Sequence, residues 1–142
     1  MKVKDIMAKD IITVTPETTL KELAGIIKKK KIHGVPVLDQ NGELVGIMTV
    51  SDMLGILKGL VYWGELEKIK PGLGIKDALM KEKENAVVGQ NMSKAVRTIK
   101  EDDSVEKVLE LMCKHNVHTI PVVKEGKIVG VVGASDIIEI FV

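Results

Sequence analysis

The strongest constraint on the fold of this chain is an internal repeat. Residues 46–52 read GIMTVSD and residues 130–136 read GVVGASD, each at the end of a longer shared pattern. An offset of 85 positions aligns Met7 with Met92, and the offset falls to 84 in the final segment because the second turn is one residue shorter. Each unit alone is too small to bury a sufficient core, so we expect the two to pack together about a pseudo-twofold axis.

Within each repeat, hydrophobic periodicity and turn residues predict a strand, a helix, a hairpin and a second helix. The first helix begins at Thr19, because Glu22 follows three residues later and completes a capping box. Asn41-Gly42 is a strong signal for the turn of the hairpin. The elements predicted in the first repeat are a strand at 11–14, a helix from 19 to 31, strands at 35–38 and 44–48, and a helix after residue 52.

The segment between the repeats is longer than a plain linker. The helix that follows the first hairpin should continue to residue 61 and end at Gly64, with a loop at 71–74 and a further helix at 75–83. This insert is either a structural lid over the core or a surface for a partner. The predicted fold is α+β, with two β-α-β-β-α repeats. The boundaries are 1–60 for the first repeat, 61–86 for the insert and 87–142 for the second repeat.

The corner after each hairpin has residues suited to binding an anion and a sugar. Its pattern predicts a strand that turns sharply into a helix, with Ser51 or Ser135 at the N-cap. Backbone N–H groups and the positive end of the helix then point at one place, which suits a phosphate. Thr49 and Ser51 add hydroxyls, and the Asp52 carboxylate can accept from a ribose diol. Ordinary helix capping is the alternative, but the repetition favours binding.

Charge and composition disfavour several classes of function. The net charge is +1, from 21 basic and 20 acidic residues, so bulk electrostatics does not favour nucleic acid. We find no apolar run long enough to span a bilayer and no signal peptide. A single cysteine agrees with a reducing compartment, so we expect a cytoplasmic protein. Because the aromatic residues number only three, a bound base should lie mostly between aliphatic side chains.

Catalytic and metal-binding interpretations have less support. Cys113, His115 and His118 suggest a metal site, but positions 113 and 115 lie about 200° apart on a helix and no second cluster completes the ligands. Cys113 is better explained as a small helix residue at the margin of the core. We find no Ser-His-Asp order, paired catalytic carboxylates or P-loop, so an enzyme is disfavoured. The lysines at 28–31 fit a solvated helix end, with phosphate capture as the alternative.

The segment KIHGVPVLDQNGELVGIMTVSD and its second copy NVHTIPVVKEGKIVGVVGASD resemble the motif of cystathionine-β-synthase (CBS) domains. The shared pattern is an apolar-His-x-apolar-Pro step, a hairpin, and then Gly-apolar-apolar-Thr/Ser-x-Ser-Asp. The resemblance covers nearly the whole chain except residues 53–86. It implies a CBS-domain pair in which two small sheets face each other and leave two clefts. Such pairs bind adenosine-containing ligands and usually regulate something else.

The resemblance also implies which residues hold the ligand. In the family, the aspartate of the corner holds the ribose hydroxyls, and the hydroxyl three residues earlier faces phosphate. Thr49 fits the second role but its counterpart is Gly133, so the first cleft should bind phosphorylated ligands more strongly. The early strand and the apolar-His step of the other repeat hold the base. The implied ligand-binding residues are Thr49, Ser51, Asp52, Val96, Thr98, Val117 and His118 in one cleft, and Ile11, Thr13, Ile32, His33, Ser135 and Asp136 in the other.

His33 and His118 either face phosphate, as a His or Ser does in the family, or are satisfied, partly buried histidines. We expect the chain to be a regulatory module that binds AMP, ADP, ATP, S-adenosylmethionine or a related ligand and signals to a separate partner protein. We expect no catalytic residue, metal or cofactor. The alternative is a structural scaffold with empty clefts, which the apolar insert favours. A homodimer is expected, because two pairs commonly form a disc. Its predicted contacts are Leu54, Leu57, Ile137 and Ile138.

Overall fold

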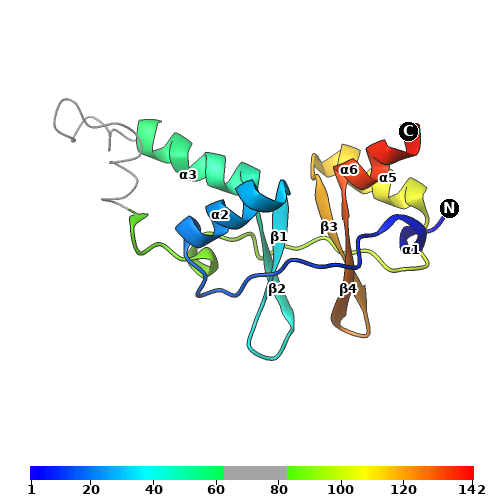
Figure 1. The fold of residues 1–142 in the computed structure, drawn as a ribbon, viewed down its shortest axis with the longest axis horizontal. Coiled ribbons are helices and arrows are strands. Elements are labelled where there is room, and N and C mark those ends of the chain that lie inside the picture. Colours follow the sequence, from blue (N-terminus) through cyan, green and yellow to red (C-terminus); the bar gives the residue numbers. More distant parts are fainter. Residues whose placement is uncertain (63–82) are drawn as a thin grey trace.

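The computed structural model describes residues 1–62 and 83–142, and it has the α+β architecture of two repeats that the sequence predicts. Two antiparallel hairpins lie at the centre of Figure 1, with their turns on one side and helices on the other. The first repeat contains α1 (Val3–Ile6), α2 (Leu20–Lys30), β1 (Gly34–Leu38), β2 (Leu44–Thr49) and α3 (Val50–Tyr62). The second contains η1 (Val88–Gln90), α5 (Val105–His115), β3 (Thr119–Lys124), β4 (Lys127–Gly133), α6 (Ala134–Ile138) and η2 (Glu139–Phe141).

Part of the predicted insert can be compared with the structure. The helix predicted to continue out of the first corner is α3, which extends to Tyr62. The predicted loop at 71–74 and nearly all of the helix predicted at 75–83 lie outside the described residues. In the part of the chain that is described, no helix has both the length and the apolar character needed to cross a membrane.

The strand predicted at 11–14 is reduced to a single parallel bridge. The Val14 N–H donates to the Pro36 carbonyl (3.1 Å), and the Leu38 N–H donates to the Val14 carbonyl (2.9 Å). The second repeat has the equivalent bridge between Ile99 and Val122. Pairing stops at one residue because the chain turns toward α2 on one side, while on the other side residues 11 and 12 line a cavity between the repeats.

The two repeats exchange their N-terminal segments. Val3, in α1, is fully buried in the core of the second repeat, and the Val3 N–H donates to the Asp103 carbonyl (2.9 Å). Val88, its counterpart, is fully buried in the core of the first repeat, and its N–H donates to the Thr18 carbonyl (2.8 Å). Each hydrophobic core therefore contains a residue from the other repeat, which is the mutual completion that the short length of each unit predicts.

Each hairpin also gains a backbone partner from the other repeat. Ala8 and Val131 exchange both backbone hydrogen bonds, at 2.8 and 3.0 Å. Ser93 and Ile47 do the same on the other hairpin, with both bonds at 2.9 Å. These bridges cover the outer edges of β4 and β2, which would otherwise leave N–H and C=O groups without partners. They also hold the two repeats in one relative orientation.

Glycine is required beside these bridges because the crossing chain comes very close. A Cβ atom at Gly46 would lie 3.0 Å from the Ser93 carbonyl oxygen, and one at Gly130 would lie 3.1 Å from the Ala8 carbonyl oxygen. The two glycines are equivalent positions of the repeat. They explain why Gly opens both copies of the motif: it allows the backbone of the other repeat to pack directly on the strand.

The starts of the helices confirm the predicted cap at Thr19 and correct those predicted at Ser51 and Ser135. Thr19 caps α2 by accepting from the Glu22 N–H (3.1 Å), and Ser104 caps α5 by accepting from the Lys107 N–H (3.2 Å). The prediction that Ser51 and Ser135 are N-caps is wrong, because α3 and α6 each begin one residue before the serine. The capping position is three residues before the aspartate, occupied by Thr49 and Gly133. The serines lie inside the first turn of their helices.

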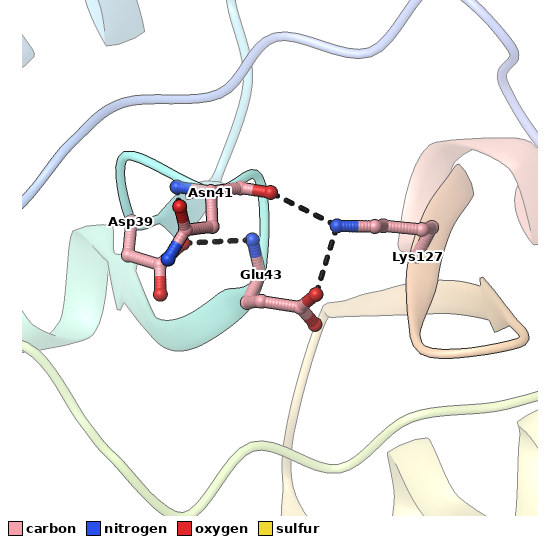
Figure 2. A network of polar contacts seen from close by, with 4 residues as sticks. All are labelled: Asp39, Asn41, Glu43 and Lys127. Carbon is pink, nitrogen blue, oxygen red and sulfur yellow. Dashed lines mark hydrogen bonds and ion pairs between the residues drawn. The ribbon is translucent and has the colours of Figure 1, made fainter.

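The tips of the two hairpins are joined by a polar network (Figure 2). The Asp39 carboxylate accepts from the N–H groups of Asn41 (2.8 Å) and Glu43 (2.9 Å), which fixes the predicted turn. From the other repeat, the Lys127 ammonium donates to the Asn41 carbonyl (2.9 Å) and pairs with the Glu43 carboxylate (2.8 Å). The repeats are therefore tied together at the hairpin tips as well as at their N-terminal segments.

Candidate functional site

Two cavities lie where the repeats meet, and each is lined by residues from both. The larger, of about 280 Å³, lies beside Asp52 and is here named the Asp52 cavity. The smaller, of about 160 Å³, lies beside Asp136 and is named the Asp136 cavity. In each case a corner from one repeat faces the early segment and the apolar-His step of the other. A molecule bound in either cavity would contact both repeats at once.

In the Asp52 cavity, the corner forms a closed hydrogen-bonded ring at the start of α3. Oδ2 of Asp52 accepts from the backbone N–H of Thr49 (2.8 Å) and from its hydroxyl (2.9 Å). The same hydroxyl accepts from the Asp52 N–H (3.2 Å), and the Ser93 hydroxyl donates to Oδ1 of Asp52 (3.3 Å). The Thr49 proton is therefore committed to Asp52, so a phosphate contact by this hydroxyl requires that bond to change partner.

The corner of the Asp136 cavity has fewer side-chain partners. Oδ2 of Asp136 accepts from the Gly133 N–H (2.7 Å), and within the described residues Oδ1 has no hydrogen-bond donor. Gly133 has a φ of −101°, which any residue can adopt. A Cβ atom there would meet no atom closer than 3.5 Å. Neither backbone conformation nor space therefore requires a glycine at this position.

His33 and His118 lie between the two cavities and line both. Their backbone carbonyls accept from the first N–H groups of the following helices, at 2.9 Å from Val50 and 2.8 Å from Ala134. Both residues are exposed, so the interpretation of them as partly buried histidines is wrong. Among the described residues, neither imidazole has a hydrogen-bond partner in the protein. Their rings are thus available to a ligand in either cavity.

The structure brings together most of the residues that the sequence assigned to each cleft. Thr13 does not line the Asp136 cavity, although Asp10, Ile11 and Ile12 do. Val96 and Thr98 do not line the Asp52 cavity, because alternate residues of an extended segment point in opposite directions. Ala95 and Arg97 line the Asp52 cavity in their place. The predicted residues that do line the Asp52 cavity are Thr49, Ser51, Asp52, Val117 and His118. Those that line the Asp136 cavity are Ile11, Ile32, His33, Ser135 and Asp136.

Sequence reasoning overlooked Asp10 and Arg97, two other charged side chains of these walls. The third, Lys31, belongs to the lysine run at 28–31, for which phosphate capture was the alternative interpretation. A signal for Arg97 was present, since it is the only arginine in the sequence. The pKa of His115 is lowered, first by partial burial of the imidazole and then by the nearby positive charges of Arg97 and Lys114. The prediction that Cys113 lies at the margin of the core is wrong, because this residue is exposed on α5. In residues 1–62 and 83–142, no three His, Cys, Asp or Glu side chains are grouped as metal ligands would be.

Comparison with known proteins agrees with this architecture. The family model for the CBS domain matches residues 3–59 and 85–142. Protein MJ1426 of Methanocaldococcus jannaschii is 36% identical over 155 residues, covering 98% of this chain and 90% of that protein. Inosine-5'-monophosphate dehydrogenase of the same organism is 31% identical over 139 residues, but the match spans only 23% of the enzyme's length.

A solved structure supplies the corresponding comparison of folds. It is the CBS domain pair of protein MJ0100 in complex with 5'-methylthioadenosine and S-adenosyl-L-methionine. That chain is 31% identical with a TM-score of 0.73, and the alignment covers 99% of this chain and 95% of the other. With two matched repeats, a shared motif and a shared fold, the chain belongs to the CBS domain family and is a pair of CBS domains.

Proposed function

We propose that this chain is a regulatory module that binds an adenosine-containing ligand between its two CBS repeats and transmits the bound state to a partner protein. The observation that carries the proposal is the pair of cavities, each with an aspartate in the first turn of a helix and walls from both repeats. The carboxylate suits a ribose diol, and the N–H groups at the helix start suit an anionic group. The related MJ0100 pair, which holds two adenosine compounds, supports the same ligand class.

The position of the cavities provides a route from binding to regulation. Because a ligand contacts both repeats, its binding free energy depends on their relative orientation. A ligand that binds one orientation better shifts the population toward it, by an amount set by its differential affinity. The hairpin-tip network and the exchanged segments are the contacts that such a shift would have to adjust. The cavities contain hydroxyls and carboxylates, but within the described residues no hydroxyl is hydrogen-bonded to an imidazole as in an activated serine.

Association of two chains is part of the proposal. Exposed apolar side chains lie on α3 and at the C-terminal end, where a homodimer would bury them. Leu54 is 59% exposed and Ile138 is 60% exposed, as expected for contacts. The predicted contact at Ile137 is wrong, because this side chain is 8% exposed and belongs to the core of the second repeat. The same surface would serve the alternative function, a scaffold with empty cavities.

Calorimetric titration of the protein with AMP, adenosine and S-adenosylmethionine tests the proposal. At least one compound should bind, and Asp52→Ala together with Asp136→Ala should weaken that binding by about 10- to 100-fold, as expected when hydrogen bonds to charged groups are lost. Glu110→Ala is a matched control that should leave binding unchanged, because it removes a carboxylate at an exposed position that lines neither cavity. Absence of binding by all three compounds would favour the scaffold function. Sedimentation should show twice the chain mass of 15.5 kDa.

A further inference from the structure

The internal repeat allows the two cavities to be compared position by position. Both have a serine and an aspartate in the first turn of a helix, and both share the two histidines between them. These groups therefore cancel in a comparison of charge. What differs is the wall contributed by the early segment of the opposite repeat, where equivalent positions carry different side chains. The difference in charge between the cavities comes from that wall and from Lys31, whose counterpart in the Asp52 cavity is the neutral Asn116.

The Asp52 cavity has an arginine where the Asp136 cavity has an apolar residue. Arg97 lines the first, and Ile12, its counterpart in the repeat, lines the second. Of the 21 basic residues in the sequence, Arg97 is the one arginine. It is exposed, and in the described part of the chain no carboxylate lies within ion-pair distance of it. A guanidinium offers a rigid fork of N–H donors that matches two oxygens of a phosphate.

The Asp136 cavity has an additional carboxylate instead. Asp10 lines it, at the position that Ala95 occupies in the Asp52 cavity. Lys31 is the cation of this cavity. It directly follows the C-terminal end of α2, where the partial negative charge of the helix dipole offsets part of the positive potential of the lysine. One lysine thus stands against two aspartates here, whereas one arginine stands against one aspartate in the other cavity. The Asp136 cavity is the more acidic of the two.

We propose that the two cavities select adenosine ligands of different charge. The Asp52 cavity takes a phosphorylated ligand such as AMP, with the Arg97 guanidinium on the phosphate. The Asp136 cavity takes an uncharged or cationic derivative, such as adenosine or S-adenosylmethionine, with Asp10 beside the group that replaces the phosphate. The inference rests on the proposed function, since both ligands share the adenosine moiety. One module would then respond to two classes of ligand at separate places.

Exchange of equivalent residues tests the assignment without introducing foreign side chains. Arg97→Ile gives the Asp52 cavity the residue of its counterpart, and Asp10→Ala does the same for the Asp136 cavity. Calorimetry with AMP, adenosine and S-adenosylmethionine should show that Arg97→Ile weakens AMP binding by about 10- to 100-fold, the range for a charge-assisted hydrogen bond. Adenosine binding should stay within about twofold, because adenosine has no phosphate to lose. Asp10→Ala should weaken S-adenosylmethionine binding by about two- to fivefold, the upper part of the range for an exposed ion pair.

Two further variants separate a specific contact from general electrostatics. Arg97→Lys keeps the charge but loses the fork, so it should recover part of the AMP affinity. Lys94→Ala removes a positive charge from the same segment at an exposed position that does not line the cavity, and AMP affinity should stay within about twofold. An equal change in AMP and adenosine affinity in Arg97→Ile would overturn the assignment while the proposed function stands. If the unmodified protein binds none of the three compounds, the proposed function fails and the inference fails with it.

Discussion

The corners at Asp52 and Asp136 have the same backbone and different side-chain hydrogen bonding. Each carboxylate accepts from the N–H three residues earlier, at 2.8 Å from Thr49 and 2.7 Å from Gly133. Asp52 accepts in addition from the hydroxyls of Thr49 and Ser93, whereas Asp136 keeps an oxygen without a donor in the described part of the chain. The repeated backbone therefore fixes where each carboxylate lies, and the residues around it decide how much of its hydrogen-bonding capacity the protein itself uses.

The comparison extends to the cores, where the largest effects are expected. Leu23 in α2 and Val108 in α5 are equivalent positions, and both are fully buried. Leu23→Ala should lower the free energy of unfolding by about 2–5 kcal/mol. Val108→Ala should cost about 0.8 kcal/mol less, because one fewer carbon is removed from the core. Equilibrium unfolding in urea measures both values.

The same experiment tests whether the two repeats unfold together. Because Val3 and Val88 are each buried in the core of the opposite repeat, both variants should show one cooperative transition at a lower urea midpoint. Ser135→Ala, at an exposed position, provides a control that should shift the midpoint little. Two separated transitions, one for each repeat, would show that the exchanged segments do not couple the cores.

The corners themselves should differ in their contribution to stability without ligand. Asp52→Ala removes the acceptor of three donors, two from Thr49 and one from Ser93, so it should cost about 1–3 kcal/mol. Asp136→Ala removes the acceptor of one backbone donor and should cost about 1 kcal/mol or less. Urea unfolding of the two variants side by side measures the difference. Equal losses would mean that the hydroxyl contacts at Asp52 add nothing.

A single substitution can make the second corner more like the first. Gly133→Thr should raise the free energy of unfolding by a few tenths of a kcal/mol, since threonine is somewhat less flexible than glycine and its hydroxyl can reach Asp136 as Thr49 reaches Asp52. The backbone angle and the space around Gly133 both permit it. Thermal unfolding compared with Gly133→Ala isolates the hydroxyl. If threonine were no better than alanine, the hydroxyl would not be closing the ring.

Local signals in the sequence predicted the local structure well. The cap at Thr19 and the Asn-Gly turn are predicted from neighbouring residues, and both are present in the structure. The cap at Ser51 was misplaced because Thr49 and Ser51 are both good capping residues, and only the three-residue spacing to Asp52 distinguishes them. The sequence pattern alone does not show whether Thr49 or Ser51 is the cap.

Long-range relations were harder to predict, for a physical reason. The sequence shows that Val3 is apolar but not which core it enters, because both cores consist of apolar residues. The wall of the Asp52 cavity depends on which alternate residues of an extended segment face inward. The choice of Val96 and Thr98 over Arg97 followed the family resemblance, and only the packing of this segment against β2 decides it. The charge difference between the cavities follows from that choice and so could not be derived beforehand.

A further small effect is predicted at the hairpin tips, where the two repeats contact each other. Lys127 and Glu43 pair at 2.8 Å, with side chains 54% and 50% exposed. An exposed ion pair contributes about 0.2–1 kcal/mol, so the coupling energy from Lys127→Ala, Glu43→Ala and the double variant should fall in that range. Lys127→Ala also removes the bond to the Asn41 carbonyl and should cost slightly more than Glu43→Ala. Urea unfolding at about 0.05 M and 1 M salt should show the coupling shrinking at high salt, because water and ions screen exposed charges. A coupling energy near zero at both salt concentrations would show that this ion pair adds nothing to the stability of the two repeats, and that their other contacts hold them together.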